Sequence, residues 1–119
     1  MRFKDKRHNF GADAENLIAE KYIEWGYSIV SRRYRTPYGE IDLIAKKENV
    51  LVFIEVKARK DPVTDEYISK SQIRRNNNAA QFFLFTYNHY QNHKIRFDLG
   101  VVSGNTIYDI IENAWFADS

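Results

Sequence analysis

The sequence contains no cysteine, no apolar run long enough to cross a membrane and no internal repeat. The missing cysteines exclude a disulfide framework, a thiolate metal site and a cysteine nucleophile. A membrane helix needs about 20 predominantly apolar residues, and no segment approaches that length. The basic N-terminus is not followed by an apolar segment, so we expect no signal peptide. A cytoplasmic protein without a membrane partner is the expectation.

The chain has 119 residues, of which 44% are hydrophobic and 29% charged. That length suits one domain and is too short for two. We expect residues 1–9 to form a flexible basic arm and residues 10–119 to form a single domain.

Strongly basic character is also missing, because the net charge is only +2. The cations are nevertheless clustered, and clustered cations suit a polyanion such as nucleic acid. A solvated surface of mixed charge is the alternative interpretation. The clusters are Arg2/Lys4/Lys6/Arg7, Arg32/Arg33/Arg35, Lys57/Arg59/Lys60 and Lys70/Arg74/Arg75.

The pattern of apolar residues predicts a layered α/β domain. Ala14, Ile18, Tyr22 and Trp25 recur at helical spacing, whereas the apolar run from residue 50 to residue 54 is typical of a strand covered on both faces. We expect helices over residues 10–25 and 70–90, and strands over residues 27–36, 40–45, 50–58, 95–102 and 106–111. In this order, α-β-β-β-α-β-β, helices would flank a central mixed sheet.

Three charged residues lie in segments that otherwise look built for a core: Asp42, Glu55 and Lys57. Side chains alternate along a strand, so Glu55 and Lys57 project from the same face. The short turn between the second and third strands favours antiparallel pairing, which would bring Asp42 beside Glu55. Burying a charge is expensive unless it is paired or holds a metal. A divalent-metal site is the favoured interpretation, and a buried ion-pair group is the alternative.

A third acid, Glu15, lies near the start of the first helix, where the helix dipole favours a carboxylate. It overlaps the apolar stripe and is expected to face the sheet, with an exposed first-turn acid as the alternative. Carboxylate ligands of this kind suit Mg²⁺ or Mn²⁺, and the backbone carbonyl of Val56 could add an oxygen. Lys57 could orient an attacking water or neutralise charge on a phosphate.

These residues carry a family resemblance. Asp42 followed thirteen positions later by Glu55-x-Lys57 resembles the PD-(D/E)xK nuclease superfamily, which includes restriction enzymes and Holliday-junction resolvases. More closely, the chain resembles the YraN-like family of small bacterial proteins over about residues 9–116. The matching segments are Gly11-x-x-Ala14-Glu15, Gly26-Tyr27-x-Ile29, Arg35, Gly39–Ala45, Phe53–Lys57, Arg96-Phe97-Asp98 and Asn113-Ala114.

The resemblance implies a restriction-endonuclease-like fold with Asp42, Glu55 and Lys57 in the metal site. Glu15 would be a further ligand or a supporting acid. Ile41 stands where the superfamily usually has proline. Glu40 belongs to the narrower family motif, and its role as a metal ligand or a surface turn residue is left open.

The predicted function is metal-dependent hydrolysis of phosphodiester bonds, with DNA as the expected substrate and branched or damaged DNA among its candidate forms. The alternatives are a catalytically silent nucleic-acid-binding module and a protein-interaction domain. Gln72 has the position of a capping-box partner of Ser69 or of a site residue. Residues 82–85 are interpreted as core with partial exposure, and a base-stacking platform or a homodimer interface is the alternative. The predicted nucleic-acid-binding residues are Arg32, Arg33, Arg35, Arg59, Lys60, Lys70, Gln72, Arg74 and Arg75.

Overall fold

The computed structural model describes residues 10–63 and 67–117, with side chains from residue 13 onward, and in this part of the chain a group of strands follows each α-helix. The elements are α2 (Phe10–Glu24), β1 (Ser28–Thr36), β2 (Gly39–Lys47), β3 (Val50–Ala58), α3 (Lys70–Thr86), the 3₁₀ helix η1 (Asn88–Tyr90), β4 (Lys94–Ser103) and β5 (Thr106–Trp115). This order confirms the predicted succession of helices and strands. The predicted basic arm lies outside the described residues.

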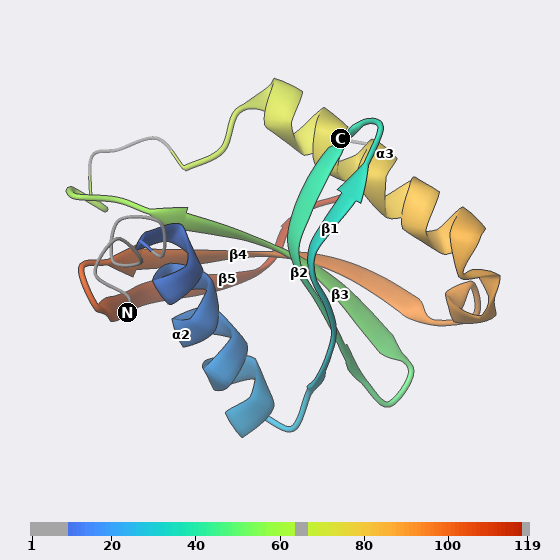
Figure 1. Cartoon of the computed structure of the whole chain (residues 1–119), viewed down its shortest axis with the longest axis horizontal. Helices are drawn as coiled ribbons and strands as arrows, with labels where there is room; N and C mark the ends of the chain where they lie inside the picture. The colour runs from blue at the N-terminus through green and yellow to red at the C-terminus, as the bar shows by residue number, and fades with distance from the viewer. Residues whose placement is uncertain (1–9, 64–66, 118–119) are drawn as a thin grey trace, which may run out of the picture.

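The five strands form one sheet in the order β1-β2-β3-β4-β5. Neighbours are antiparallel except for β3 and β4, which run parallel and are joined through α3. A parallel pair needs a long crossover, and α3 with its flanking loops supplies it. Figure 1 shows α2 and α3 on opposite sides of the twisted sheet, so the predicted fold class is confirmed. None of the described helices is long and apolar enough to span a membrane.

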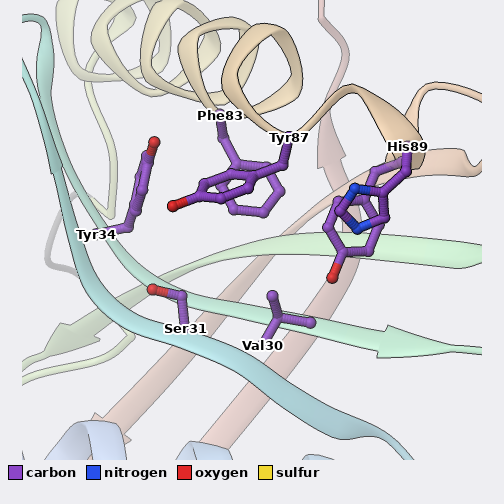
Figure 2. A pocket seen from close by; sticks show the side chains of 7 residues that line it. Val30, Ser31, Tyr34, Phe83, Tyr87 and His89 are labelled. Carbon is purple, nitrogen blue, oxygen red and sulfur yellow. The ribbon is translucent and has the colours of Figure 1, made fainter.

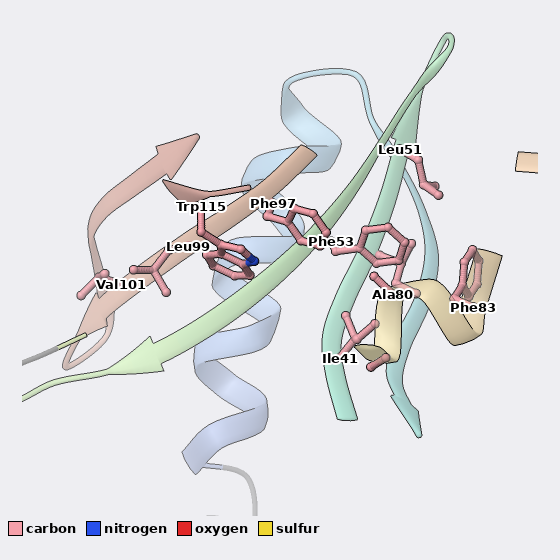
Figure 3. Packing of buried hydrophobic residues seen from close by; sticks show 11 residues of the cluster. Ile41, Leu51, Phe53, Ala80, Phe83, Phe97, Leu99, Val101 and Trp115 are labelled. Atoms are coloured by element: carbon pink, nitrogen blue, oxygen red, sulfur yellow. The ribbon is translucent and has the colours of Figure 1, made fainter. Parts of the chain in front are cut away.

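Strand β3 is covered on both faces, as its unbroken apolar run predicts. Leu51 and Phe53 point toward α3 and pack in the cluster that includes Phe83 (Figure 3). Val52 and Ile54 point the other way and pack in the cluster beneath α2. Side chains that alternate along a strand must separate in this manner. The alternation also decides which face receives the charged residues that follow.

Glycine ends the first helix close to the predicted position. Helix α2 was expected to reach Trp25 and ends at Glu24. Gly26 has φ +97°, a conformation that side chains rarely adopt. This turn lets the N–H of Tyr27 donate to the carbonyl of Tyr22 at 2.9 Å and sends the chain into β1.

The second helix is shorter than predicted. It was expected to reach Tyr90 and ends at Thr86, because Tyr87 leaves the helical region with φ −115° and ψ 71°. The chain then makes one 3₁₀ turn and enters β4, where the N–H of Lys94 donates to the carbonyl of Asn49 at 2.7 Å. The helix must stop early because β4 has to begin beside the start of β3.

The last strand is longer than predicted. The expected strand over residues 106–111 continues to Trp115, after a shift in register against β4. Asn113 sits at this irregularity with φ +54°, and its N–H donates to Asp98 Oδ1 at 3.1 Å. The bulge interrupts the alternation of apolar and polar residues, so the pattern alone ends the strand too soon.

A buried ionic network ties α2 to β4. Asp98 is completely buried and accepts hydrogen bonds from Arg96 Nε and Nη2, both at 2.9 Å. The hydroxyl of Tyr22 donates to the same carboxylate at 2.5 Å. Burial and the Asp98 charge both raise the pKa of Tyr22, so its hydroxyl stays protonated. These contacts compensate the charge of Asp98 within the core. They give the Arg96-Phe97-Asp98 motif a structural role.

Candidate active site at the opening between strands β2 and β3

Strands β2 and β3 separate at the end where the predicted acids lie. Their backbone ladder stops at the pair Leu43 and Ile54. Asp42, the next residue outward on β2, accepts a hydrogen bond through Oδ2 from the backbone N–H of Val56 at 2.8 Å. A side-chain carboxylate therefore takes the place of a backbone acceptor. A strand residue directs its N–H and C=O at the same neighbour, so the Val56 carbonyl also faces the opening.

On β3, Glu55 and Lys57 form an ion pair with 2.9 Å between Oε2 and Nζ. Both side chains lie largely buried on the α3 face of the strand, as the predicted alternation requires. Gln72 on α3 joins them: its Nε2 donates to Glu55 Oε2 at 3.2 Å, and its Oε1 accepts from Lys57 Nζ at 3.1 Å. Asn76 donates to Glu55 Oε1 at 3.2 Å. The Glu55 carboxylate is thus held by three side-chain donors.

Helix α3 positions these amides through its N-terminus. Ser69 caps the helix and accepts a hydrogen bond from the backbone N–H of Gln72 at 3.1 Å. The Gln72 side chain does not complete a capping box, because it contacts Glu55 and Lys57 instead. Asn76 was not predicted as a site residue from the sequence. It lies one helical turn after Gln72, and that spacing places both amides on one face of the helix.

The surroundings of Asp42 change its pKa. Burial and the nearby Glu55 carboxylate raise the pKa of Asp42 to about 7. Glu15 acts in the same direction, whereas the Val56 N–H and the Lys57 ammonium act in the opposite direction. Near neutral pH the Asp42 carboxyl group therefore favours a bound proton or a nearby cation over a bare charge.

Glu15 approaches this pair from α2. Its side chain is only 13% exposed, so the expected orientation toward the sheet is confirmed and the exposed alternative is wrong. It accepts a hydrogen bond from Arg33 Nε at 3.1 Å, and this bond raises the pKa of Arg33. Arg33 lies on β1, beside the segment of β2 that carries Asp42. The Glu15 carboxylate therefore forms an ion pair with Arg33 and also lies close enough to Asp42 to raise its pKa.

Glu40 lies at the surface. Its Oε2 accepts a hydrogen bond from Arg35 Nε at 3.2 Å, and its side chain is 37% exposed. On the neighbouring strand, Arg32 donates to Asn16 at 2.8 Å. Exposed contacts of this type contribute about 0–1 kcal/mol to stability. A phosphate could therefore take the place of Asn16 or Glu40 as the partner of these arginines.

The remaining predicted cations fall into two groups. Arg59 is half-buried and donates to the carbonyls of Ala58 at 3.0 Å and Tyr67 at 3.1 Å, which gives it a role in holding the loop after β3. The others are exposed, and three of them lie on α3 next to Gln72. This second group comprises Lys60, Lys70, Arg74 and Arg75.

Three oxygen groups border the opening: the carboxylates of Asp42 and Glu55 and the carbonyl of Val56. The hydrogen bonds among described residues use only Oδ2 of Asp42. Within residues 13–63 and 67–117, no three His, Asp or Glu side chains are close enough to hold a metal by themselves. A divalent cation at this point would complete its coordination shell with the Val56 carbonyl and with water. Mg²⁺ commonly keeps several water ligands when it binds to one or two carboxylates.

The comparison with known proteins confirms the family that the sequence motifs indicated. The model of an uncharacterised protein family, UPF0102, matches residues 14–102, which include every site residue described above. The chain belongs to this family. The matched region begins beside Glu15 in α2 and ends with Val102 in β4, so it includes both sides of the opening but not β5.

Relatives in the UPF0102 family resemble the chain over most of its length. The UPF0102 protein of Desulfosudis oleivorans is 37% identical over 122 aligned residues, covering 96% of this chain and 95% of the relative. That of Ruegeria pomeroyi is 38% identical, with 92% and 90% covered. That of Nitrobacter winogradskyi is 39% identical, with 78% and 80% covered. The family name states no activity, so the chemistry has to be argued from the site.

Proposed function

We propose that this protein hydrolyses phosphodiester bonds in DNA with the help of Mg²⁺ or Mn²⁺. The observation that carries the proposal is the opening between β2 and β3. There Asp42, Glu55 and the Val56 carbonyl meet beside the Lys57 ammonium. The resemblance of these residues to the PD-(D/E)xK nucleases supports the same chemistry.

The residues at the opening suit a hard divalent cation. Its natural ligands are carboxylate and carbonyl oxygens, which Asp42, Glu55 and Val56 supply, with Glu15 close enough to influence the charge. The raised pKa of Asp42 supports this fit, because a cation would compensate the charge that burial and Glu55 disfavour. When bound, such a cation would lower the pKa of a water and stabilise negative charge on the scissile phosphate.

Lys57 would act on the phosphate directly. Its ammonium has three N–H donors, of which Glu55 and Gln72 take two. The third can donate to a phosphate oxygen or to the attacking water. Because Glu55 and Gln72 fix the ammonium from two sides, little side-chain freedom is lost when the substrate arrives.

The exposed cations on α3 and β1 would hold the DNA backbone. Contacts of this kind to phosphates position a strand without reading its sequence. Arg74 and Arg75 on α3 are suitably exposed next to the site. Arg35 on β1 is 85% exposed, and its ion-pair partner among the described residues is the half-buried Glu40.

A cleavage screen tests the proposal. The full chain is incubated with duplex, junction, flap and single-stranded DNA and with RNA, in Mg²⁺, in Mn²⁺ and in EDTA. We expect cleavage of at least one DNA substrate that requires the metal and is abolished by Asp42→Ala and by Lys57→Ala. The exposed residues Asp109 and Lys94 provide the matched controls Asp109→Ala and Lys94→Ala, which should keep full activity. Cleavage that survives both site substitutions would contradict the proposal.

One observation favours a second candidate, a DNA-binding module without turnover. Glu55 is already held by Lys57, Gln72 and Asn76, so the carboxylate is satisfied without a metal. Such a module would bind DNA with an affinity that falls steeply with salt and would cleave none of the substrates. Binding without metal-dependent cleavage in the same screen would select this candidate.

A further inference from the structure

A cavity of about 230 Å³ lies between β1 and the C-terminal end of α3, away from the acids. Its lining consists of Val30, Ser31, Tyr34, Phe83, Tyr87, His89 and Tyr90. Figure 2 shows Val30 and Ser31 on one side and the rings of Tyr34, Phe83 and Tyr87 around the space, with His89 at the far end. The proposed nuclease chemistry uses none of these side chains.

The sequence creates this hollow with an irregularity in an edge strand. The register between β1 and β2 shifts between Ile29 and Ser31, so Val30 has no cross-strand partner. Bulges of this kind bend a strand and occur often beside functional sites. Val30 and Ser31, at this irregularity, line the cavity opposite Phe83 of α3 and Tyr87 just beyond its end.

The lining selects a flat, uncharged ring. The ring of Tyr34 is 5.1 Å from that of Phe83 at 85°, and the ring of Tyr87 is 4.9 Å from that of Phe83 at 45°. Phe83 itself is buried, so a third ring would contact the more accessible rings of Tyr34 and Tyr87. No charged side chain is among the described lining residues. Hydroxyl groups and the His89 imidazole offer hydrogen bonds to the edge of a heteroaromatic ring.

The size of the cavity limits the ligand to one ring system. Sites for drug-sized ligands enclose roughly 300–1,000 Å³, and this cavity is smaller. Tyr87 is 42% exposed, so the cavity is accessible to a ligand ring from solvent on the side of this residue. A single nucleobase has this size, planarity and lack of charge.

Cations and aromatic rings connect the cavity to the candidate active site. Gln72 and Tyr87 are separated by about 22 Å along α3, from the helical rise per residue. Between them, the side chain of Arg75 lies beside Gly39, and the rings of Tyr38 and Phe82 are 6.4 Å apart. A strand that follows α3 would meet a cation, then an aromatic pair, then the cavity. Alternating cations and rings of this kind are typical of single-strand binding.

We infer that the cavity between β1 and α3 holds one unstacked nucleobase of a single-stranded segment whose phosphodiester backbone reaches the opening between β2 and β3. The inference rests on the proposed function and narrows its substrate to nucleic acid with a single-stranded region. In a duplex the base would have to leave its stack first, so a single strand, a flap or a junction would bind more tightly.

Binding of a single strand without metal tests the inference separately from cleavage. The probe is a fluorescent oligodeoxynucleotide of about 12 nucleotides, within the site sizes of roughly 4–16 nucleotides known for such surfaces. Affinity for the full chain is measured by anisotropy in EDTA. A series of probes with one abasic position each shows where a base is needed. We expect affinity to fall about 5- to 150-fold at one position, the range for loss of a base–aromatic stack.

Tyr87→Ala should weaken the intact probe by a similar factor, and the two changes together should weaken it no further. Phe85→Ala is the matched control, because Phe85 lies on the same helix, is 82% exposed and does not line the cavity. It should change affinity less than about twofold. A photoreactive 5-iodouracil at the sensitive position should crosslink the unmodified protein at Tyr34, Tyr87 or His89, which keeps the test valid even if Tyr87→Ala misfolds.

Each contrary outcome overturns the inference in its own way. Equal losses for Tyr87→Ala and Phe85→Ala, with cleavage intact, would overturn the base site and leave the proposed function standing. Absence of binding to every nucleic acid, together with absence of cleavage, would overturn both. Equal affinity for a free mononucleotide would mean that the cavity serves a small molecule. A dimer that Tyr87→Ala dissociates would mean that a second copy of the chain covers the cavity.

Discussion

Asp42→Asn is the substitution that most directly tests the electrostatics of the candidate site. Asparagine keeps an oxygen that can accept the hydrogen bond from Val56, and it removes the charge. The pKa of Asp42 is about 7 in the folded protein, above the ordinary value of 3.8. The substitution therefore isolates the free energy of holding a charged carboxylate that is largely buried and lies near Glu55.

The sign follows from linkage. Because the folded pKa of Asp42 is the higher one, the unfolded chain releases its proton first as the pH rises, and ionisation favours unfolding. The destabilisation is absent below about pH 4, grows as the pH rises toward 7 and is complete above it. At 1.36 kcal/mol per unit the complete effect is about 4 kcal/mol, of which about 2–3 kcal/mol develops between about pH 5 and pH 8.

Unfolding of the wild type and of Asp42→Asn is measured in EDTA across this pH range. The difference between the two proteins cancels the titration of the histidines that they share. We expect the variant to gain about 2–3 kcal/mol on the wild type from about pH 5 to pH 8, or about 10 °C in relative melting temperature at about 4 °C per kcal/mol. The exposed Asp109→Asn should show no such gain. A wild-type-to-variant difference that stays constant over this range would refute the reasoning.

Metal provides the second half of the test. A divalent cation that binds the folded site stabilises it by mass action. Millimolar Mg²⁺ should therefore raise the melting temperature of the wild type at about pH 8 and reduce its deficit relative to Asp42→Asn. If Mg²⁺ stabilises both proteins equally, Asp42 is not a metal ligand.

Two substitutions in the core should lower stability without any dependence on metal. Gly100→Ala would place a Cβ 2.7 Å from Ile18 Cδ1, so it should destabilise the protein by about 1–3 kcal/mol in urea unfolding; no change would mean that α2 can move away from β4 freely. Asp98→Ala leaves the Arg96 guanidinium without its buried partner and should destabilise by about 3–5 kcal/mol. The control is Asp109→Ala at an exposed position, which should keep the free energy of unfolding within about 0.5 kcal/mol of the wild type. Equal losses of stability for Asp98→Ala and Asp109→Ala would contradict the structural role of Asp98.

Local patterns predicted the parts of the site that lie on single strands. Glu55 and Lys57 share a face because a strand repeats every two residues, and this period is visible without any tertiary information. The short turn between β2 and β3 predicted their antiparallel pairing and hence the approach of Asp42. The orientation of Glu15 toward the sheet followed from the overlap of its position with the apolar stripe of α2.

Contacts between distant segments were harder to predict. Gln72 was expected in a capping box or in the site, and only the packing of α3 on the sheet selects the site. Asn76 carried no local signal beyond its spacing from Gln72. Strand β5 was predicted too short because the positive φ of Asn113 depends on Asp98, fifteen positions earlier in the sequence.

The sequence by itself determined the order of the elements, the mixed sheet and the presence of charge within apolar strands. These properties depend on short-range periodicity and on the composition of single segments. Only the tertiary structure decided that β2 and β3 separate beside Asp42, that two amides of α3 hold Glu55, and that a bulge in β1 leaves an aromatic cavity beneath α3. Those features arise where elements far apart in the chain meet, because their geometry depends on how a twisted sheet and a crossing helix fill the space between them.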